Sequence, residues 1–226
     1  MSRRADVRVL IVDDQPLVRM GHTLVLDSAE GITVIGEAAT GEEAIARAAA
    51  LSPDVVLMDI RMPGIGGVEA TRIITASPSA PHVLVLTTFD LDEYAFSALQ
   101  AGASGFLLKS APPERLVTAV RAVVSGEAVV EARITRQLID HYVRRAPATA
   151  PGAAGRPHEL LALTSREYEI FLAMAGGQSN PEICADLHLS PATVKTHINR
   201  IFSKLGLRDR VQAVILAHSL GISDSH

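Results

Sequence analysis

The chain has 226 residues, of which 48% are hydrophobic and 20% charged, the composition of a globular protein with one or two domains. Its single cysteine excludes an intrachain disulfide, and no apolar run approaches the ~18 residues that a membrane helix needs, so we expect no membrane partner. The apolar run behind the basic N-terminus is short and ends in two aspartates, which argues against an export signal and favours the cytoplasm.

The net charge of −4 hides an asymmetry between the two halves of the chain. Through Val143 there are 12 Lys and Arg against 18 Asp and Glu, whereas from Arg144 onward there are 9 against 7. Between Thr193 and Arg210 five cations face one aspartate. An acidic first half and a locally basic second half indicate two different functions, and the basic segment favours nucleic-acid binding.

Apolar runs alternate with helical patterns in the first half. The runs predict strands at Val7–Val12, Thr33–Ala38, Val55–Met58, Val83–Thr87 and Gly105–Leu108. The 3.6-residue patterns predict helices at Gln15–Ser28, Gly41–Leu51, Gly67–Ala76, Asp92–Ala101 and Pro112–Ser125. Alternation in units of this length favours a parallel sheet with helices on both faces.

Three aspartates come at the ends of two predicted strands, Asp13 and Asp14 after the first strand and Asp59 after the third. Functional groups of an open parallel sheet gather at the carboxyl ends of its strands, so these carboxylates should meet. Clustered carboxylates repel one another unless a cation joins them, and Mg²⁺ prefers such oxygen ligands. The sequence therefore predicts an acidic Mg²⁺ site.

Asp59 is the predicted phosphoacceptor, because a carboxylate can attack a phosphoryl donor to give an aspartyl phosphate. Lys109, after the last strand, would add positive charge around the transferred group. Thr87 ends the fourth strand and offers a hydroxyl, for which Thr88 competes. Each residue taken alone also fits a solvated turn or a helix cap, so the prediction depends on their common position at strand ends.

The first half resembles the receiver domain of bacterial two-component response regulators. The matching segments are Leu10-Ile-Val-Asp13-Asp14, Met58-Asp59-Ile-Arg61-Met62-Pro63-Gly64, Thr87-Thr88 and Gly102-Ala-Ser-Gly105-Phe106-Leu-Leu-Lys109. The resemblance implies an α/β flavodoxin-like (βα)₅ fold for residues 1–125 and phosphorylation of Asp59 by a sensor histidine kinase. One departure is Ser110, where many receivers have proline.

The same resemblance implies a role for each residue of the site. Asp13, Asp14, Asp59 and the main-chain carbonyl of Arg61 would surround Mg²⁺. Thr87, rather than Thr88, would be the hydroxyl residue, and Phe106 the switch aromatic that turns inward when the hydroxyl moves. Without the resemblance, Phe106 reads as an ordinary core residue.

Residues 126–158 are predicted to connect two domains. A helix is expected over Ala132–Val143, and the stretch from Arg144 to Pro157 is rich in Ala, Pro and Gly, which indicates a semi-flexible linker. The remainder is helical in pattern, with starts at Thr164, Ser179 and Ser190 and a last helix at Arg208–Leu220. Four short helices with a tight turn between the second and third indicate a helix-turn-helix unit.

The segment 191–205 is the predicted DNA-reading helix. Its core stripe is expected to hold Val194, Ile198, Ile201 and Leu205. The opposite face carries small polar groups between basic edges, a pattern suited to base edges and phosphates in a major groove. An amphipathic helix with a solvated outer face explains the pattern equally well. The residues expected to contact double-stranded DNA are Thr193, Lys195, Thr196, Asn199, Arg200 and Lys204.

This second half resembles the all-α, four-helix LuxR-type helix-turn-helix domain, expected over residues 159–226. The matching segments are Leu163-Thr-Ser-Arg-Glu167, Ser179-Asn-Pro-Glu-Ile183, Ser190-Pro-Ala-Thr-Val-Lys195-Thr-His197 and Lys204-Leu-Gly-Leu-Arg-Asp-Arg210. Together the two resemblances identify the chain as a member of the NarL/FixJ family of response regulators. They imply a homodimer on DNA, and the second apolar face of the last helix suggests its contact residues: Val211, Val214 and Ile215.

The expected function is phosphorylation-controlled DNA binding without turnover of a separate substrate, although the protein would assist its own phosphotransfer and dephosphorylation. A phosphatase with an aspartyl-phosphate intermediate is one rival, but such enzymes usually carry the nucleophile as the first residue of an Asp-x-Asp pair, and here Arg61 stands two residues after Asp59. A ligand-gated DNA binder and a small-molecule quorum receptor are the others. The acidic cluster argues against the former, and the lack of Trp argues against the aromatic pocket of the latter.

Overall fold

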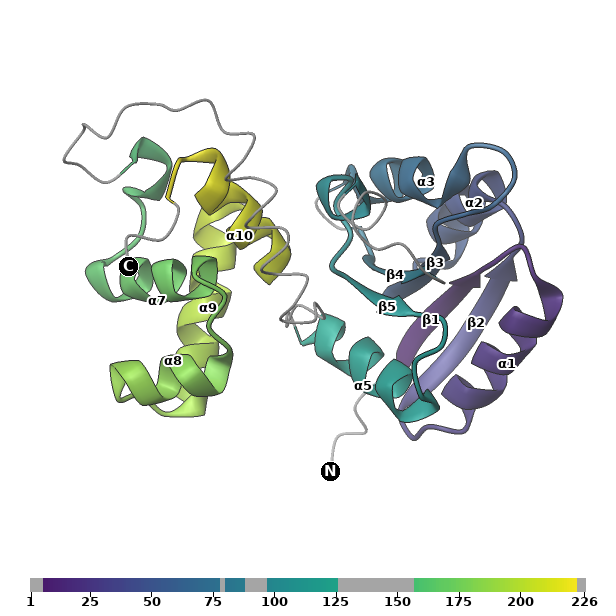
Figure 1. Ribbon diagram of the computed structural model, residues 1–226, viewed down its shortest axis with the longest axis horizontal. Helices are drawn as coiled ribbons and strands as arrows, with labels where there is room; N and C mark the ends of the chain where they lie inside the picture. The colour runs from purple at the N-terminus through teal and green to yellow at the C-terminus, as the bar shows by residue number, and fades with distance from the viewer. Residues whose placement is uncertain (1–5, 78–79, 88–96, 126–156, 223–226) are drawn as a thin grey trace. The chain divides into compact units, whose positions relative to one another are not determined.

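The structure, a computed structural model, describes residues 6–77, 80–87, 97–125 and 157–222 (Figure 1). The chain divides into two compact units, Met1–Val130 and Glu131–His226. Each unit is described by itself. Among the described residues, no helix is long and apolar enough to cross a bilayer.

The first unit is built on a sheet of five parallel strands in the order β2-β1-β3-β4-β5. This order confirms the flavodoxin-like prediction. The strand bounds agree with the predicted bounds to within one residue: β1 Val7–Val12, β2 Ile32–Ala38, β3 Val55–Asp59, β4 His82–Thr87 and β5 Gly105–Leu108. Residues 9–12 of β1 and 55–58 of β3 are buried on both faces of the sheet, which explains why these stretches are apolar without alternation.

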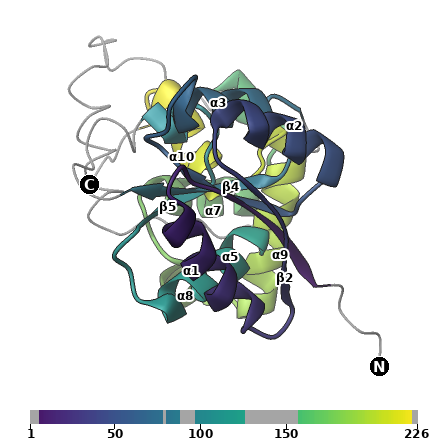
Figure 2. The ribbon, with the colours of Figure 1, turned by 90° about the vertical axis from the view of Figure 1, so that its right-hand side faces the viewer.

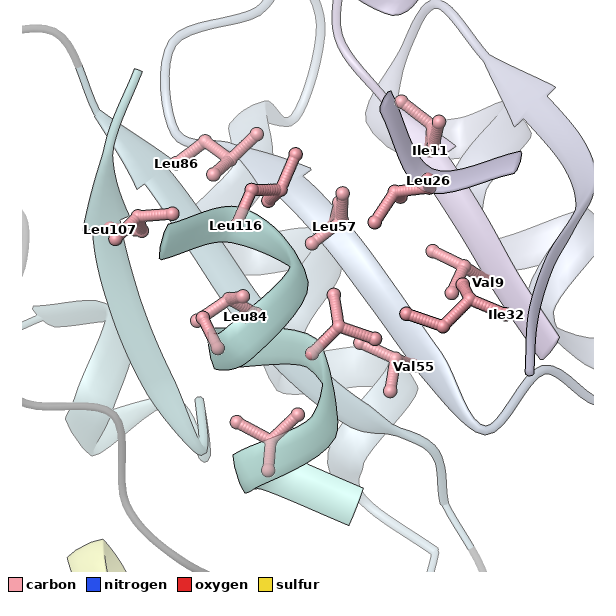
Figure 3. Close-up of a cluster of buried hydrophobic side chains, with 13 residues drawn as sticks. Val9, Ile11, Leu26, Ile32, Val55, Leu57, Leu84, Leu86, Leu107 and Leu116 are labelled. Carbon is pink, nitrogen blue, oxygen red and sulfur yellow. The ribbon is translucent and has the colours of Figure 1, made fainter. Parts of the chain in front are cut away.

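Helices cover both faces of this sheet (Figure 1, Figure 2). Their bounds are α1 Pro16–Asp27, α2 Gly41–Leu51, α3 Gly66–Thr75 and α5 Pro113–Val124. On one face, Leu26 of α1 and Leu116 of α5 pack with alternate strand residues such as Leu57 and Leu84 (Figure 3). α2 and α3 pack together on the other face.

Local sequence determines where these helices begin. Pro16 and Pro113 stand in the first turn of α1 and α5, where the missing N–H of proline costs no hydrogen bond. Thr40 caps α2 by accepting a hydrogen bond from the Glu43 N–H. Of the predicted helix Asp92–Ala101, only the end lies in the described residues, and 97–100 are helical. The predicted helix 132–143 and nearly all of the linker lie outside the described residues.

The second unit is helical. A single 3₁₀ turn, η1 His158–Leu160, precedes α7 Ser165–Ala175, α8 Asn180–Leu187, α9 Pro191–Leu205 and α10 Arg210–Ser219. The capping boxes at Thr164 and Ser179 confirm two predicted helix starts. The last helix begins at Arg210 rather than at the predicted Arg208, because the Asp209 side chain caps it by accepting from the Gln212 N–H. The 3₁₀ turn was not predicted, since three residues carry no periodic signal.

α9 packs against both α7 and α8. Its core stripe is the predicted one: Val194, Ile198 and Ile201 are buried, and Leu205 packs partly buried against the same cluster. Phe171 and Met174 of α7 fill the centre. The tight turn between α8 and α9 passes through His188, whose positive φ of 53° ends α8. These contacts fix the face that α9 turns away from its own unit.

Candidate acidic site and candidate nucleic-acid interface

The three predicted carboxylates meet at one edge of the sheet. β1 and β3 are adjacent, with Val12 opposite Met58, so the residues that follow them lie side by side. Asp13, Asp14 and Asp59 each place a carboxylate oxygen within 4.8 Å of the others. Asp13 and Asp59 are buried. The convergence that the sequence predicted for these three residues is therefore present.

Lys109 joins two of these acids from a third strand. Its ammonium nitrogen lies 2.6 Å from Oδ2 of Asp13 and 2.7 Å from Oδ2 of Asp59, and its side chain is 9% exposed. The Lys109 N–H donates to the Thr87 carbonyl at 2.7 Å, which places the lysine directly beyond β5. One cation thus faces three carboxylates, and the cluster keeps a negative surplus that favours a further positive charge.

Burial and the lysine act on the Asp59 carboxyl in opposite directions. Burial raises the pKa of Asp59, and the hydrogen bond and charge of Lys109 offset that rise only in part. Burial also works to lower the pKa of Lys109, but its contacts with Asp13 and Asp59 together leave that pKa above the ordinary value. The lysine therefore stays charged near neutral pH.

The remaining carboxylate oxygens test whether the site fits a metal ion. Oδ1 of Asp13 accepts from the Gln15 N–H at 2.9 Å, and Oδ1 of Asp59 accepts from the Arg61 N–H at 3.3 Å. Oδ1 of Asp14 is buried and has no hydrogen-bond partner among the residues that the structure describes. An unpartnered buried oxygen beside two other carboxylates fits a hard divalent cation, which would supply the missing partner.

The predicted switch residues lie on the neighbouring strands. Thr87 ends β4 and is buried, and Phe106 on β5 is also buried and pairs across the sheet with Val85. Thr88 lies outside the described residues, so the structure does not decide between the two threonines. Because the Thr87 carbonyl accepts a hydrogen bond from the Lys109 N–H, Thr87 lies at the same edge of the sheet as the acidic residues.

Gly67 belongs to this site and was missed as a functional residue. A Cβ added there would lie 1.8 Å from the main-chain oxygen of Asp59, so only glycine allows α3 to start this close behind β3. The Gly67 N–H also donates to the Ile60 carbonyl at 2.9 Å. Three glycines between residues 64 and 67 were the available signal, because such density marks close backbone approach.

The predicted DNA-contacting residues of α9 fall on its outer face. Lys195, Thr196, Asn199 and Arg200 are exposed, and Thr193 is partly exposed. The Thr193 hydroxyl lies 2.8 Å from that of the capping Ser190. The exposed strip is thus available to a ligand of the second unit.

Lys204 has a partner within its own unit. Its ammonium lies 2.6 Å from Oε2 of Glu167, a buried carboxylate that also accepts from the Thr164 N–H at 2.7 Å. The hydrogen bond from Lys204 is the main reason that the pKa of Glu167 falls to about 2. The sequence analysis missed this pairing, and the predicted DNA contact of Lys204 stays a prediction.

The last helix presents the two predicted apolar faces differently. On the first face, Ala213 and Ala217 are buried in the core of the unit. On the second, Val211 and Val214 are also buried, whereas Ile215 is partly exposed. A contact of the second face with another subunit stays a prediction.

An acidic pocket at the carboxyl edge of a (βα)₅ sheet, followed by a helix-turn-helix unit, defines a signal-receiving domain joined to a DNA-binding domain. Residues 9–121 match the family described as response regulator receiver domain, and residues 161–217 match the bacterial regulatory proteins of the luxR family. The chain belongs to the NarL/LuxR family of DNA-binding response regulators of two-component systems.

Similar proteins match along nearly the whole chain. The transcriptional regulatory proteins LnrK and LiaR of Bacillus subtilis (strain 168) are each 41% identical, over 96% and 94% of this chain and 99% and 97% of their own lengths. Among solved structures, the response regulator ChrA of a heme-sensing two-component system is 36% identical. The match covers 97% of this chain and 100% of the ChrA chain, with a TM-score of 0.51.

Proposed function

We propose that this protein is a cytoplasmic transcription regulator whose DNA binding is controlled by phosphorylation of Asp59 by a sensor histidine kinase. The observation that supports this most is the geometry of Lys109, which bridges Asp13 and Asp59 beside Oδ1 of Asp14, an oxygen without a partner in the part of the chain that the structure describes. Such a site combines a nucleophile, a fixed cation and carboxylate oxygens that fit a second cation, the parts that phosphoryl transfer requires. The cytoplasm is proposed because the DNA partner lies there.

The proposed chemistry is a single displacement at phosphorus. A carboxylate oxygen of Asp59 forms the new O–P bond while the P–N bond to the kinase histidine breaks, and its electron pair leaves with the imidazole nitrogen. Lys109 balances charge that develops on the phosphoryl oxygens. Mg²⁺ would be held by Asp13, Asp14, Asp59 and the Arg61 carbonyl, and would neutralise phosphoryl charge when bound.

In this proposal the phosphoryl group also biases the surface of the first unit. Its added charge draws the Thr87 hydroxyl and Lys109 towards the new oxygens, and Phe106 follows into the space that Thr87 leaves. Because Thr87 and Phe106 stand on adjacent strands, movement of one changes the packing of the other. The protein would assist its own phosphotransfer and dephosphorylation without turning over a separate substrate.

DNA would be bound by α9 of two subunits. Lys195 and Arg200 lie at the edges of the exposed strip, where they would meet phosphates, and Asn199 lies between them, where it could pair with adenine. Thr193 and Thr196 would complete the contact near the helix start. A homodimer through Val211, Val214 and Ile215 would place two α9 helices on half-sites about one DNA turn apart.

The proposed domain limits follow from the same assignment. Residues 1–125 would form the receiver, 126–158 the connection and 159–226 the DNA-binding domain. The division into two compact units supports two separately folded parts.

The test compares DNA retained by the full chain with and without phosphorylation. The protein would be incubated with acetyl phosphate and Mg²⁺, mixed with random duplexes, and the retained DNA sequenced, for wild type and Asp59→Asn. We expect labelled wild-type protein to enrich a two-fold symmetric sequence, and Asp59→Asn to take up no phosphate and to show no phosphate-dependent enrichment. Undiminished labelling of Asp59→Asn would reject Asp59, and equal enrichment with and without phosphate would reject the control mechanism.

A further inference from the structure

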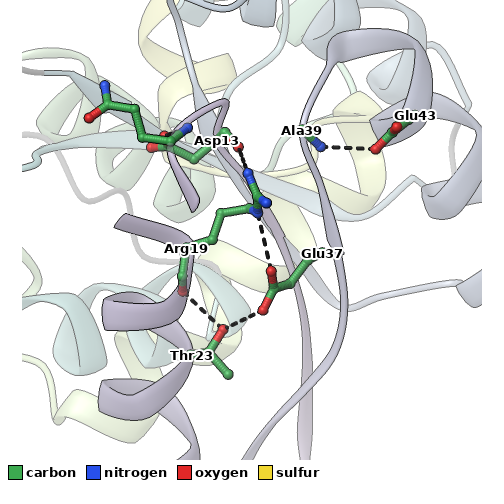
Figure 4. Close-up of polar contacts among 7 residues, drawn as sticks. Asp13, Arg19, Thr23, Glu37, Ala39 and Glu43 are labelled. Carbon is green, nitrogen blue, oxygen red and sulfur yellow. Dashed lines mark hydrogen bonds and ion pairs between the residues drawn. The ribbon is translucent and has the colours of Figure 1, made fainter. Parts of the chain in front are cut away.

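Arg19 of α1 links the acidic site to the neighbouring strand β2. Its guanidinium donates to the main-chain oxygen of Asp13 at 2.7 Å and pairs through Nε with Oε2 of Glu37 at 3.1 Å (Figure 4). The Arg19 side chain is only 16% exposed, although Glu37 is 43% exposed. A largely buried arginine fork with two fixed acceptors is a rigid arrangement rather than a solvated surface pair.

The second acceptor is itself held in place. The Thr23 hydroxyl lies 3.0 Å from Oε1 of Glu37 and 3.0 Å from the Arg19 carbonyl (Figure 4). Glu37 stands on β2 directly opposite Ile11 of β1, so it is anchored by the sheet ladder. The network therefore ties the first turn of α1 to the strand pair from which the acidic residues emerge.

The bond to the Asp13 carbonyl acts on two acids at once. This carbonyl belongs to the planar peptide unit that joins Asp13 to Asp14, so holding its oxygen restricts the orientation of both residues. The Asp13 side chain has further restraints, an ion pair to Lys109 and a bond from the Gln15 N–H. Oδ1 of Asp14 has no partner in the described part of the chain, so the placement of Asp14 depends on its backbone.

We infer that Arg19 is a positioning residue for the cation-binding geometry of the acidic site, with Glu37 as its anchor. The inference rests on the proposed function, because it assumes that Asp13 and Asp14 together bind a divalent cation. Arg19 reaches the peptide backbone and not the reacting atoms, so its loss should weaken cation binding more than the chemical step. Groups that orient metal ligands typically change metal affinity about 10- to 100-fold when removed.

The experiment uses the full chain with Arg19→Gln and a matched control, Arg72→Gln. Arg72 pairs instead with Glu69 at 3.1 Å on α3. Mg²⁺ affinity would be measured by calorimetric titration, and acetyl phosphate labelling would be followed across Mg²⁺ concentrations. We expect Arg19→Gln to bind Mg²⁺ about tenfold or more weakly, to regain most of its labelling rate at saturating Mg²⁺, and Arg72→Gln to match wild type.

Two further variants keep the test decisive. Arg19→Lys retains the charge but cannot serve both acceptors with a planar fork, so it should bind Mg²⁺ with intermediate affinity. Glu37→Ala removes the anchor and should weaken Mg²⁺ by a smaller factor, which carries the test if Arg19→Gln fails to fold. Wild-type Mg²⁺ affinity in folded Arg19→Gln, or in Glu37→Ala where Arg19→Gln does not fold, overturns the inference. Failure of wild type itself to bind Mg²⁺ or to be labelled overturns the proposed function instead.

Discussion

Two buried carboxylate sites, one in each unit of this protein, have their hydrogen-bonding and charge requirements met to different degrees. In the second unit, Glu167 is 2% exposed, caps α7, and receives the ammonium of Lys204. In the first unit, one lysine is shared between Asp13 and Asp59, and the neighbouring Asp14 keeps an oxygen without a partner among the described residues. The acidic site of the first unit therefore holds surplus negative charge, whereas Glu167 and Lys204 form a closed pair.

This difference separates a structural role from a chemical one. A buried polar group with all partners present stabilises one conformation and has nothing left to offer a ligand. A cluster of like charges that has too few partners within the chain lowers the stability of the fold. Such a cluster is typical of a site where a bound ligand supplies the missing opposite charge. Burial of an acid alone would not have distinguished the two sites, whereas the count of its partners does.

The largest expected effect comes from removing the shared lysine. Lys109→Met should slow labelling of Asp59 by acetyl phosphate about 100- to 1,000-fold, the usual loss when one preorganised electrostatic donor is removed. The rate would be measured by the appearance of the phosphorylated chain at fixed Mg²⁺. Arg115→Met, an exposed position on α5, serves as the control and should label like wild type. Equal rates for the two variants would remove Lys109 from the proposed chemistry.

A methyl group at Gly67 should disturb the first unit without changing its charge. Gly67→Ala places a Cβ against the Asp59 carbonyl, and the forced backbone shift should cost roughly 1–3 kcal/mol of unfolding free energy in urea. Gly21→Ala is the matched control, because a Cβ there meets nothing within 4 Å and lies inside α1. That control should gain about 0.5–1 kcal/mol. A wild-type stability for Gly67→Ala would contradict the close approach.

Breaking the closed pair should destabilise the second unit. Lys204→Met leaves a buried carboxylate without its cation and should lower the free energy of unfolding by about 1–3 kcal/mol at pH 7. The control is Glu169→Gln, which removes an exposed pair with Arg166 and should cost well under about 1 kcal/mol. Chemical denaturation of both variants distinguishes a buried pair from a surface pair.

The same pair predicts a pH dependence with a definite sign. Because folding lowers the pKa of Glu167 from 4.5 to about 2, its contribution is fully present above pH 4.5 and is lost as the pH falls towards about 2. The stability difference between wild type and Lys204→Met should therefore narrow over this interval. A difference that stays constant down to pH 2 would show that the pair is not the source of the shift.

The smallest effect is expected at Asp14, whose buried Oδ1 has no partner to lose among the described residues. In EDTA, Asp14→Asn should leave the stability unchanged or raise it by less than about 1 kcal/mol, since like charges are relieved. With Mg²⁺ at 100 times its dissociation constant, wild type should gain about 2.7 kcal/mol and the variant clearly less. Thermal unfolding with and without Mg²⁺ measures both. A marked loss for Asp14→Asn in EDTA would indicate that Asp14 is a structural residue.

Much of the first unit could be predicted from sequence because its signals are local. The buried part of a parallel strand is a run of apolar residues, as in residues 9–12 of β1, and an acid placed directly behind each strand must reach the shared edge. The role of Arg19 could not be predicted, since its acceptors are a backbone oxygen and a residue 18 positions away. The importance of Gly67 was missed for a similar reason, because the atom that leaves no room for a side chain there is the main-chain oxygen of Asp59.

In the second unit the helix starts were predictable and the ion pair was not. A capping box lies within four consecutive residues, as at Thr164 and Glu167, so it can be recognised in the sequence. The ion pair instead joins Lys204 to Glu167 across 37 positions. A helical wheel of residues 191–205 predicted the buried stripe of α9 correctly. It could not show that one outer cation, Lys204, has a partner within the same unit. The partner of a long side chain depends on tertiary packing, and a helical wheel carries no information about tertiary packing.

The strand order has a consequence for the timing of signalling. Asp13, Asp59 and Lys109 follow three different strands, and β3 must be paired on both sides before the lysine can reach either acid. A chain emerging from the ribosome has no such edge until β5 has been made and docked, and pairings of this kind form late in folding. Under the proposed function, a kinase would therefore meet a complete phosphorylation site only on chains whose sheet has formed.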